Sequence, residues 1–200
     1  MNLTLTDQLQ CPACRGPGGL VLLADRVEGR RVLAGTLGCA NCRAKFRVAD
    51  GVAEFATGGA ARSHPDIGDK VRLAALLGVA EGPATLLLVG PYEGVARGLA
   101  AVVNDVEVIV ATAMPQRPGE REGVSVLQTD ARLPLRDGSV SGVMITGVDA
   151  AMIPEAVRAA GLATRVVLLG ATPESADALR AQGVQVVVEQ DDTLVAVRVY

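Results

Sequence analysis

Residues 84–94 read Ala-Thr-Leu-Leu-Leu-Val-Gly-Pro-Tyr-Glu-Gly, an aliphatic run that ends in a turn with two glycines. An almost unbroken aliphatic run of this length is typical of a strand that is buried on both faces of a parallel sheet. Residues 93–103 then carry apolar residues on one side of an expected helix. A strand, a tight turn and a helix in this order indicate the start of a doubly wound α/β fold.

The same alternation continues to the end of the chain. Further aliphatic strands are expected at residues 106–111, 124–128, 140–146 and 165–169. Helices are expected at residues 150–160, with a bend at Pro154, and at residues 173–182. Residues 184–188 and 193–199 are separated only by Glu-Gln-Asp-Asp, which predicts an antiparallel hairpin. We therefore predict a Rossmann-like, doubly wound and mostly parallel sheet with a terminal antiparallel hairpin.

A joint and a helix are expected before this sheet. Residues 56–62, Ala-Thr-Gly-Gly-Ala-Ala-Arg, are predicted to form a flexible linker. Ser63-His-Pro-Asp66 follows with the form of a helix capping box, so a helix is expected from here to Leu77. His64 is the only histidine, and its place at a helix start favours a surface role over catalysis or metal binding.

All four cysteines lie near the amino end, as Cys11-Pro-Ala-Cys14 and Cys39-Ala-Asn-Cys42. Each pair can form a tight knuckle whose sulfurs face one point, and two knuckles complete a tetrahedral shell of four thiolates. Such a shell has no open coordination position, so the sequence predicts a structural Zn²⁺ held by these four residues. Iron suits the same ligands and stays open, whereas a disulfide pair or unrelated core cysteines fit the paired spacing less well.

Short strands are expected around the knuckles, at residues 20–24, 31–37, 45–48 and 52–55. Asp50-Gly51, between the last two strands, is a strong hairpin turn signal. A unit this small cannot bury enough apolar surface by itself, so the metal would supply folding free energy. The sequence thus predicts a small β zinc ribbon at residues 1–55, a linker at 56–62 and an α/β body at 63–200.

The composition limits the possible functions. Half of the residues are apolar, the net charge is −3, and only four residues are aromatic. Nucleic-acid binders usually show a basic stripe with stacking aromatics, so nucleic acid is not an expected partner. No stretch approaches the ~20 apolar residues of a membrane span, and the polar amino end lacks an apolar signal core. We expect a cytoplasmic protein without a membrane contact, in which the cysteines stay reduced.

The predicted ribbon resembles the zinc-ribbon proteins that serve as activator subunits of methyltransferases. The resemblance covers residues 8–55 and includes the two cysteine knuckles and the closing stretch Phe46-Arg-Val-Ala-Asp-Gly-Val-Ala53. Val52-Ala53 stands where that family has Ile-Pro. The resemblance implies a protein partner or a homo-oligomer, and one hypothesis is that the ribbon regulates a methyltransferase in trans.

The predicted body resembles the class I S-adenosylmethionine-dependent methyltransferases over residues 64–200. The resemblance lies in residues 86–94, with their glycine turn, and in residues 128–140, Gln-Thr-Asp-Ala-Arg-Leu-Pro-Leu-Arg-Asp-Gly-Ser-Val. It implies S-adenosylmethionine as a cofactor, held by Gly90, Gly94, Asp130 and Ala131. A structural interpretation is also open, in which the glycines serve strand-to-helix packing and Asp130 closes a turn.

Several positions depart from the family pattern. The family needs a carboxylate at the end of the second strand for the ribose hydroxyls, and residues 107–115 carry no acid at that end. Loss of this charge-assisted interaction would cost about 2–3 kcal/mol. Tyr92 and Glu93 fill a turn that is normally small, and Leu88 replaces an acid often found in the first strand.

The other acids do not restore the pattern. Glu120 and Glu122 lie far beyond the second strand, and Asp149 is only a substitute near the end of the fourth. A nicotinamide cofactor is disfavoured because Gly-x-Gly-x-x-Gly is absent. We therefore predict a methyltransferase-like pseudoenzyme that acts as a binding, assembly or regulatory module. The alternative hypothesis is a divergent S-adenosylmethionine-dependent methyltransferase with an unknown acceptor.

Overall fold

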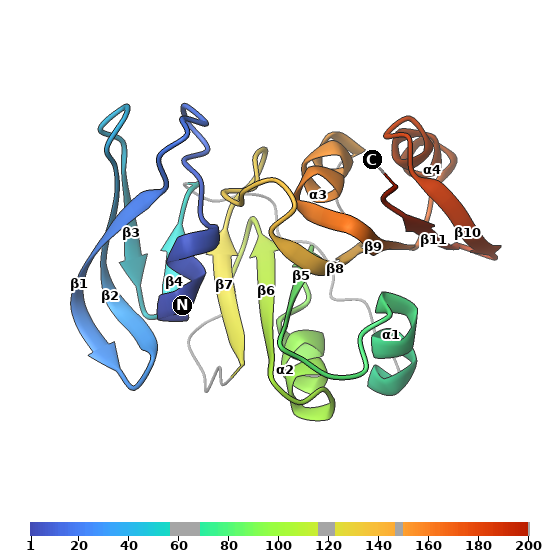
Figure 1. Cartoon of the computed structure of the whole chain (residues 1–200), viewed down its shortest axis with the longest axis horizontal. Coiled ribbons are helices and arrows are strands. Elements are labelled where there is room, and N and C mark those ends of the chain that lie inside the picture. Colours follow the sequence, from blue (N-terminus) through green and yellow to red (C-terminus); the bar gives the residue numbers. More distant parts are fainter. Residues whose placement is uncertain (57–68, 116–122, 147–149, 200) are drawn as a thin grey trace.

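A single mixed sheet runs through the computed structural model, which describes residues 1–56, 69–115, 123–146 and 150–199 (Figure 1). In these residues eleven strands follow the order β1-β2-β3-β4-β7-β6-β5-β8-β9-β11-β10. The sequence order reverses between β5 (Ala84–Val89) and β8 (Val140–Ile145), as in other doubly wound sheets.

The seven strands from β7 to β10 form the predicted body. β7 (Val124–Gln128), β6 (Val106–Thr112), β5, β8 and β9 (Ala160–Leu169) pair in parallel. β11 (Thr193–Val197) runs antiparallel to β9 and forms an antiparallel hairpin with β10 (Gln185–Gln190). The predicted Rossmann-like sheet and its terminal hairpin are therefore confirmed.

Helices cover both faces of this sheet. α1 (Lys70–Leu77) and α2 (Glu93–Val102) pack on Leu86 and Leu88 of β5. α3 (Ile153–Ala159) and α4 (Pro173–Arg180) belong to the core on the other face, together with Leu87 and Val89. Because successive strand residues point to opposite faces, the aliphatic run of β5 supplies both cores, as expected of a strand buried on two sides.

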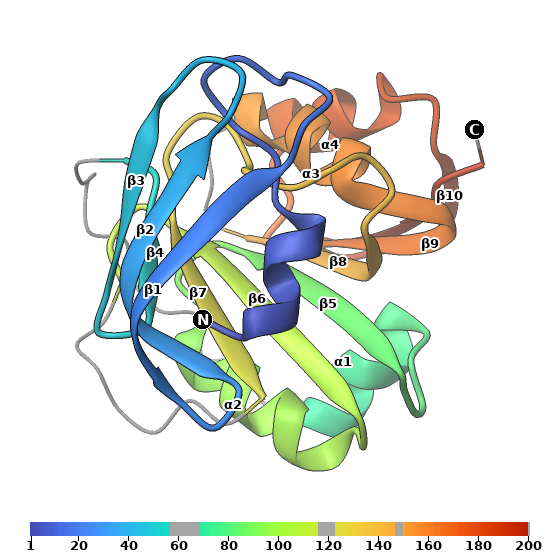
Figure 2. The same ribbon diagram turned by 60° about the vertical axis from the view of Figure 1, so that its left-hand side comes forward.

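The amino-terminal strands form the predicted ribbon and extend the same sheet (Figure 2). β1 (Leu20–Glu28), β2 (Arg31–Cys39), β3 (Lys45–Ala49) and β4 (Val52–Glu54) pair antiparallel in chain order. Asp50 and Gly51 have φ angles of 49° and 77°, so both occupy the left-handed region that a tight two-residue hairpin turn needs. β4 then pairs in parallel with β7, which joins the ribbon to the body.

A short 3₁₀ helix, η1 (Leu3–Gln8), covers the sheet face beneath the ribbon and is missing from the sequence prediction. Met1, Leu5 and Leu9 are spaced by four and are at most 2% exposed, so they face the core together. After η1, Leu9 forms an antiparallel bridge with Leu135 of the body. The described strands before and after the predicted linker thus share one continuous sheet and one core.

Two helix predictions need correction at their starts. α1 begins in the described residues at Lys70, where the Asp69 side chain accepts a hydrogen bond from the amide of Val71. The predicted capping box at Ser63, His64 and most of the predicted linker lie outside the described residues. The predicted helix at 150–160 is a 3₁₀ turn followed by α3, and Pro154 lies in the first turn of α3 rather than at a bend.

Within the described residues, no helix is both long and apolar enough to span a bilayer.

Candidate functional site

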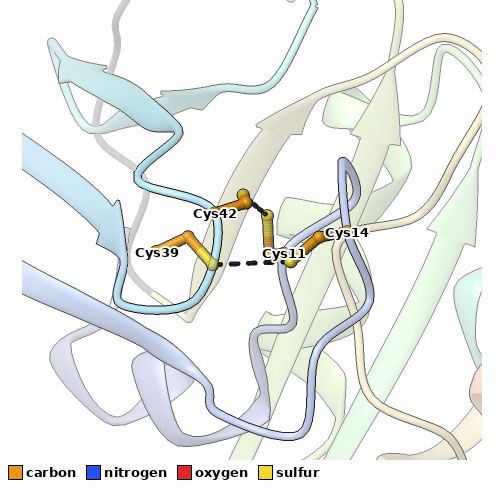
Figure 3. A group of neighbouring side chains, drawn as sticks. All are labelled: Cys11, Cys14, Cys39 and Cys42. Atoms are coloured by element: carbon orange, nitrogen blue, oxygen red, sulfur yellow. Dashed lines mark hydrogen bonds between the residues drawn. The ribbon is translucent and has the colours of Figure 1, made fainter.

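The four cysteine side chains converge on one point between two loops (Figure 3). Their sulfur atoms all lie within 4.8 Å of one another, with 3.7 Å between Cys11 and Cys42 and 3.6 Å between Cys14 and Cys39. A tetrahedral shell with Zn–S bonds of about 2.3 Å would separate its sulfurs by about 3.8 Å. All four thiols are free, so the disulfide interpretation is wrong, and the spacing suits a four-thiolate metal shell.

The two knuckles have the same backbone geometry. The amide of Arg15 donates to the carbonyl of Cys11 at 2.9 Å, and the amide of Arg43 donates to the carbonyl of Cys39 at 2.9 Å. Both arginines adopt left-handed backbone angles, with φ of 50° and 63°. The repeated Cys-x-x-Cys-Arg turn therefore aims each pair of sulfurs at the same point, as metal knuckles require.

The environment of the thiols favours different protonation states at different ligands. The side-chain amide of Asn41 and the backbone amide of Gly16 donate to the sulfur of Cys14, which lowers the pKa of that thiol to about 6. Burial raises the pKa of Cys11 to about 12. Cys14 is therefore ready to bind a cation as a thiolate, whereas Cys11 needs a bound cation to release its proton.

The first knuckle also docks on the body of the protein. Arg15 forms an ion pair with Glu155 of α3, and Arg158 donates to the same carboxylate at 3.1 Å. Burial opposes ionisation of Glu155, but the two arginines hold its pKa below the usual range. The guanidinium of Arg132 donates to the carbonyl of Pro12 at 3.2 Å, so the loop that follows β7 contacts the metal knuckle directly.

The residues predicted to hold S-adenosylmethionine follow the carboxyl ends of two strands, with Gly90 and Gly94 after β5 and Asp130 and Ala131 after β7. Gly90 is buried with φ at +133°, and a Cβ atom there would lie 2.4 Å from the carbonyl oxygen of Thr146. This close approach of β5 and the end of β8 explains the glycine by packing alone. Gly94 opens the first turn of α2, where a Cβ atom would meet nothing within 4 Å.

Asp130 and Ala131 are exposed in the loop after β7. The carboxylate of Asp130 accepts a hydrogen bond from the amide of the next residue, Ala131, at 2.6 Å. Among the described contacts, no hydrogen bond joins Asp130 to Gly90 or to Gly94.

Thr112 occupies the carboxyl end of β6, where the family pattern has its ribose-binding carboxylate. Its hydroxyl accepts a hydrogen bond from the amide of Met114, and its carbonyl accepts one from the amide of Thr129. The only acid of the described stretch 106–115 is Glu107, at the opposite end of β6. Glu120, Glu122 and Asp149 lie outside the described residues.

Tyr92 lies in the interior, in the core that also contains Leu88 and Met144. Its side chain is fully buried, and a Cβ atom on Gly90 would lie 3.4 Å from the ring. Its hydroxyl has no hydrogen-bond partner among the described residues. Burial raises the pKa of Tyr92 above its usual range, and the nearby hydroxyl of Thr146 lowers it only in part.

Because its hydroxyl has no partner, Tyr92→Phe should leave the free energy of unfolding unchanged or raise it by up to about 1 kcal/mol. Urea denaturation measures the change. Ser125→Ala is the contrasting variant, because the Ser125 hydroxyl forms hydrogen bonds with Asn2, Arg31 and Glu107. The free energy of unfolding of this variant should fall by about 1–3 kcal/mol. A loss of more than about 1 kcal/mol in Tyr92→Phe would mean that the hydroxyl is bonded in solution.

No protein-family model matches this sequence, and no curated protein is similar to it. Solved structures do share its fold. The [4+2]-cyclase SpnF matches with a TM-score of 0.51 and 17% identity over 62% of this chain and 58% of the cyclase. A candidate sarcosine dimethylglycine methyltransferase from Galdieria sulphuraria matches with a TM-score of 0.48 and 13% identity over 60% of this chain and 61% of that protein.

Precorrin-6y C5,15-methyltransferase from Geobacter metallireducens matches with a TM-score of 0.47 and 14% identity over 64% of this chain and 84% of the enzyme. The chain thus spans about three fifths of the length of SpnF and of the Galdieria protein. Identities this low show the fold alone. The protein has a Rossmann-like α/β fold, which SpnF shares, and it carries four cysteines that could hold a metal ion.

Proposed function

We propose that this chain is a zinc protein whose methyltransferase-like body is a non-catalytic module for binding, assembly or regulation. The observation that carries the proposal is Thr112 at the carboxyl end of β6. A neutral hydroxyl that already accepts an amide hydrogen bond cannot replace a carboxylate that accepts both ribose hydroxyls. The described residues therefore fit S-adenosylmethionine poorly.

Tyr92 supports the same proposal. In the class I fold, cofactor binding depends on a small turn between the first strand and the first helix, where the backbone can approach the ligand. Here the turn carries a tyrosine whose ring fills the space beside Gly90 and whose hydroxyl is directed into the protein. The glycine that resembles a cofactor residue is then retained because the strand ends pack closely at this point.

Zinc is the metal that best explains the cysteine cluster. Four thiolates close the shell, so the metal has no open position for catalysis, and Zn²⁺ prefers this tetrahedral sulfur set. The expected content is one Zn²⁺ per chain by elemental analysis. If the purified protein instead shows the visible absorption of an iron–thiolate site, the bound metal is iron and the zinc assignment is wrong.

The ribbon acts on its own chain rather than on a methyltransferase in trans. Its last strand, β4, pairs with β7 over three residue pairs, so this side of the ribbon is used within the chain, whereas β1 has no strand neighbour on its outer side among the described residues. Assembly with a protein partner, or with a second copy, would then involve other surfaces. The exposed Val21 and Leu23 on β1 support such a contact. A cytoplasmic location is part of the proposal, because four thiolate ligands require reduced cysteines.

Calorimetric titration with S-adenosylmethionine and S-adenosylhomocysteine tests the proposal. We expect no heat of binding up to about 1 mM ligand, because the ribose and the turn lack their usual partners. Binding with a Kd of about 10 µM or below would overturn the non-catalytic assignment and favour a divergent methyltransferase. Zinc content is measured on the same sample, so that an unfolded ribbon without zinc is not mistaken for a folded protein that does not bind the cofactor.

A further inference from the structure

A cavity of about 910 Å³ lies at the edge of the sheet opposite to the usual cofactor edge. The amino ends of β5, β6, β7 and β8 line it from the body, and η1 and the β1–β2 turn line it from the ribbon. Clefts between two such units are common places for small-molecule sites. The cavity is independent of the cysteine cluster and of the proposed loss of S-adenosylmethionine binding.

The back of the cavity is a fixed polar network. Glu107 forms a two-pronged ion pair with Arg31, at 2.8 and 3.0 Å, and also accepts from the side-chain amide of Asn2. Gln8 donates to the hydroxyl of Thr85 at 3.2 Å. The other atom of this amide, Oε1, is buried and has no donor among the described residues. The network therefore holds ordered polar groups beside the cavity and contains one buried, unsatisfied acceptor.

The rim of the cavity carries cations whose charge is not used elsewhere. Arg30 lies in the β1–β2 turn and Arg97 on α2, and among the described residues neither guanidinium has a hydrogen bond or an ion pair. The charge of Glu107 is already matched by Arg31, and among the described lining residues the other acid is Asp105. Two free guanidiniums against one free carboxylate favour an anionic ligand.

The neutral lining narrows the ligand class. Asn104 and Ser141 line the cavity, and their side chains have no hydrogen-bond partner among the described residues; Asp105, also in the lining, adds an acceptor. Amides, hydroxyls and a carboxylate are the groups that bind sugar hydroxyls, whereas guanidiniums bind phosphate by paired hydrogen bonds. None of the described lining residues is aromatic, so they offer no platform for a stacked base.

From this juxtaposition we propose that the cavity at the amino ends of β5–β8 is a binding site for a small phosphorylated sugar. The phosphate lies against Arg30 and Arg97, and the sugar hydroxyls lie against Asn104, Asp105 and Ser141. The ligand then contacts ribbon and body at once, so its binding stabilises their contact.

Amide NMR titration of the zinc-loaded full chain tests the site, with ribose 5-phosphate as the probe. We expect shifts at Thr4, Thr85, Arg97 and Ser141, because these residues line the cavity. Ribose or inorganic phosphate alone should bind about 10-fold more weakly, and adenosine 5′-monophosphate should gain nothing from its base. If inorganic phosphate binds as tightly as ribose 5-phosphate, the site is a plain anion site and the sugar assignment is overturned.

Matched variants separate the proposed site from surface charge. Arg97→Gln and Arg30→Gln should each weaken binding of ribose 5-phosphate by about 10-fold. Arg72→Gln on α1 is the control, since Arg72 is exposed and does not line the cavity, and it should bind like the parent protein. Equal affinity in all three variants, shifts that map elsewhere, or no shift at about 10 mM ligand would each overturn the proposal.

Discussion

Replacing Cys39 by serine is expected to remove the metal and to destabilise the entire chain. Cys39 ends β2, is 4% exposed and belongs to the same core as Leu87 and Ile145 of the body. A structural zinc contributes about 10 kcal/mol or more to folding in zinc-finger peptides, which is comparable to the whole stability of a typical domain. We expect the free energy of unfolding of Cys39→Ser to fall by at least about 3 kcal/mol, and we expect the variant to contain no zinc.

The effect should reach the body because the two parts share contacts. Taken from the sequence alone, a ribbon at residues 1–55 would unfold locally when its metal is lost. The structure changes this expectation, since β4 pairs with β7, Leu9 bridges to Leu135, and Arg15 pairs with Glu155. Removal of the ribbon would expose the apolar face that η1 covers, at a cost of about 25 cal/mol per Å².

Circular dichroism during thermal unfolding, together with elemental analysis, measures the result. Ala40→Ser is the matched control, because Ala40 is exposed in the same knuckle and provides no ligand. It should retain one zinc per chain and a parent-like melting temperature. A Cys39→Ser protein whose body amides keep their parent NMR shifts, while residues 1–55 lose theirs, would contradict the shared-core argument.

The sequence predicts the strands of the body well because each is a short aliphatic run between turn signals. The runs at 84–89, 106–112 and 124–128 are buried on both faces, so their pattern does not depend on distant partners. The cysteine site is equally readable, since paired spacing brings two sulfurs together within each knuckle before any tertiary contact forms.

The missed parts depend on contacts between distant residues. η1 is a six-residue 3₁₀ helix, too short for a periodic signal, and its only trace in the sequence is the spacing of Met1, Leu5 and Leu9. The pairing of β4 with β7 involves three residue pairs that are more than 70 positions apart in the chain. Nothing in the sequence of either strand identifies the strand with which it pairs. The three-dimensional structure was therefore needed to show that the ribbon continues the sheet.

The proposed cofactor residues show a further limit of sequence patterns. The stretch 128–140 is the most specific part of the resemblance to methyltransferases, yet here it contacts the amino-terminal segment. The amide of Gln10 donates to the carbonyl of Pro134, and the amide of Arg136 donates to the carbonyl of Gln8. Packing against the amino-terminal segment is therefore an alternative physical reason for the sequence of this stretch.

The second large effect is expected from Glu107→Ala, which removes the carboxylate that joins the ribbon to β6. Glu107 and Arg31 are only partly exposed, at 16% and 23% of their side chains, and Glu107 also accepts from Asn2 and Ser125. The variant leaves the Arg31 guanidinium without its counter-charge in a shielded position. We expect the free energy of unfolding to fall by about 3 kcal/mol in urea denaturation, with zinc still bound.

The exposed pair Arg180–Glu189 supplies the control, because its side chains are 42% and 54% exposed. Glu189→Ala should leave the free energy of unfolding nearly unchanged, since water and salt already screen that pair. In the double variant Arg31→Met with Glu107→Leu, much of the loss should return, because no unpaired charge remains between the ribbon and the body. If the double variant is as unstable as Glu107→Ala, the hydrogen bonds of Asn2 and Ser125, rather than the buried charge of Arg31, determine the stability of this contact.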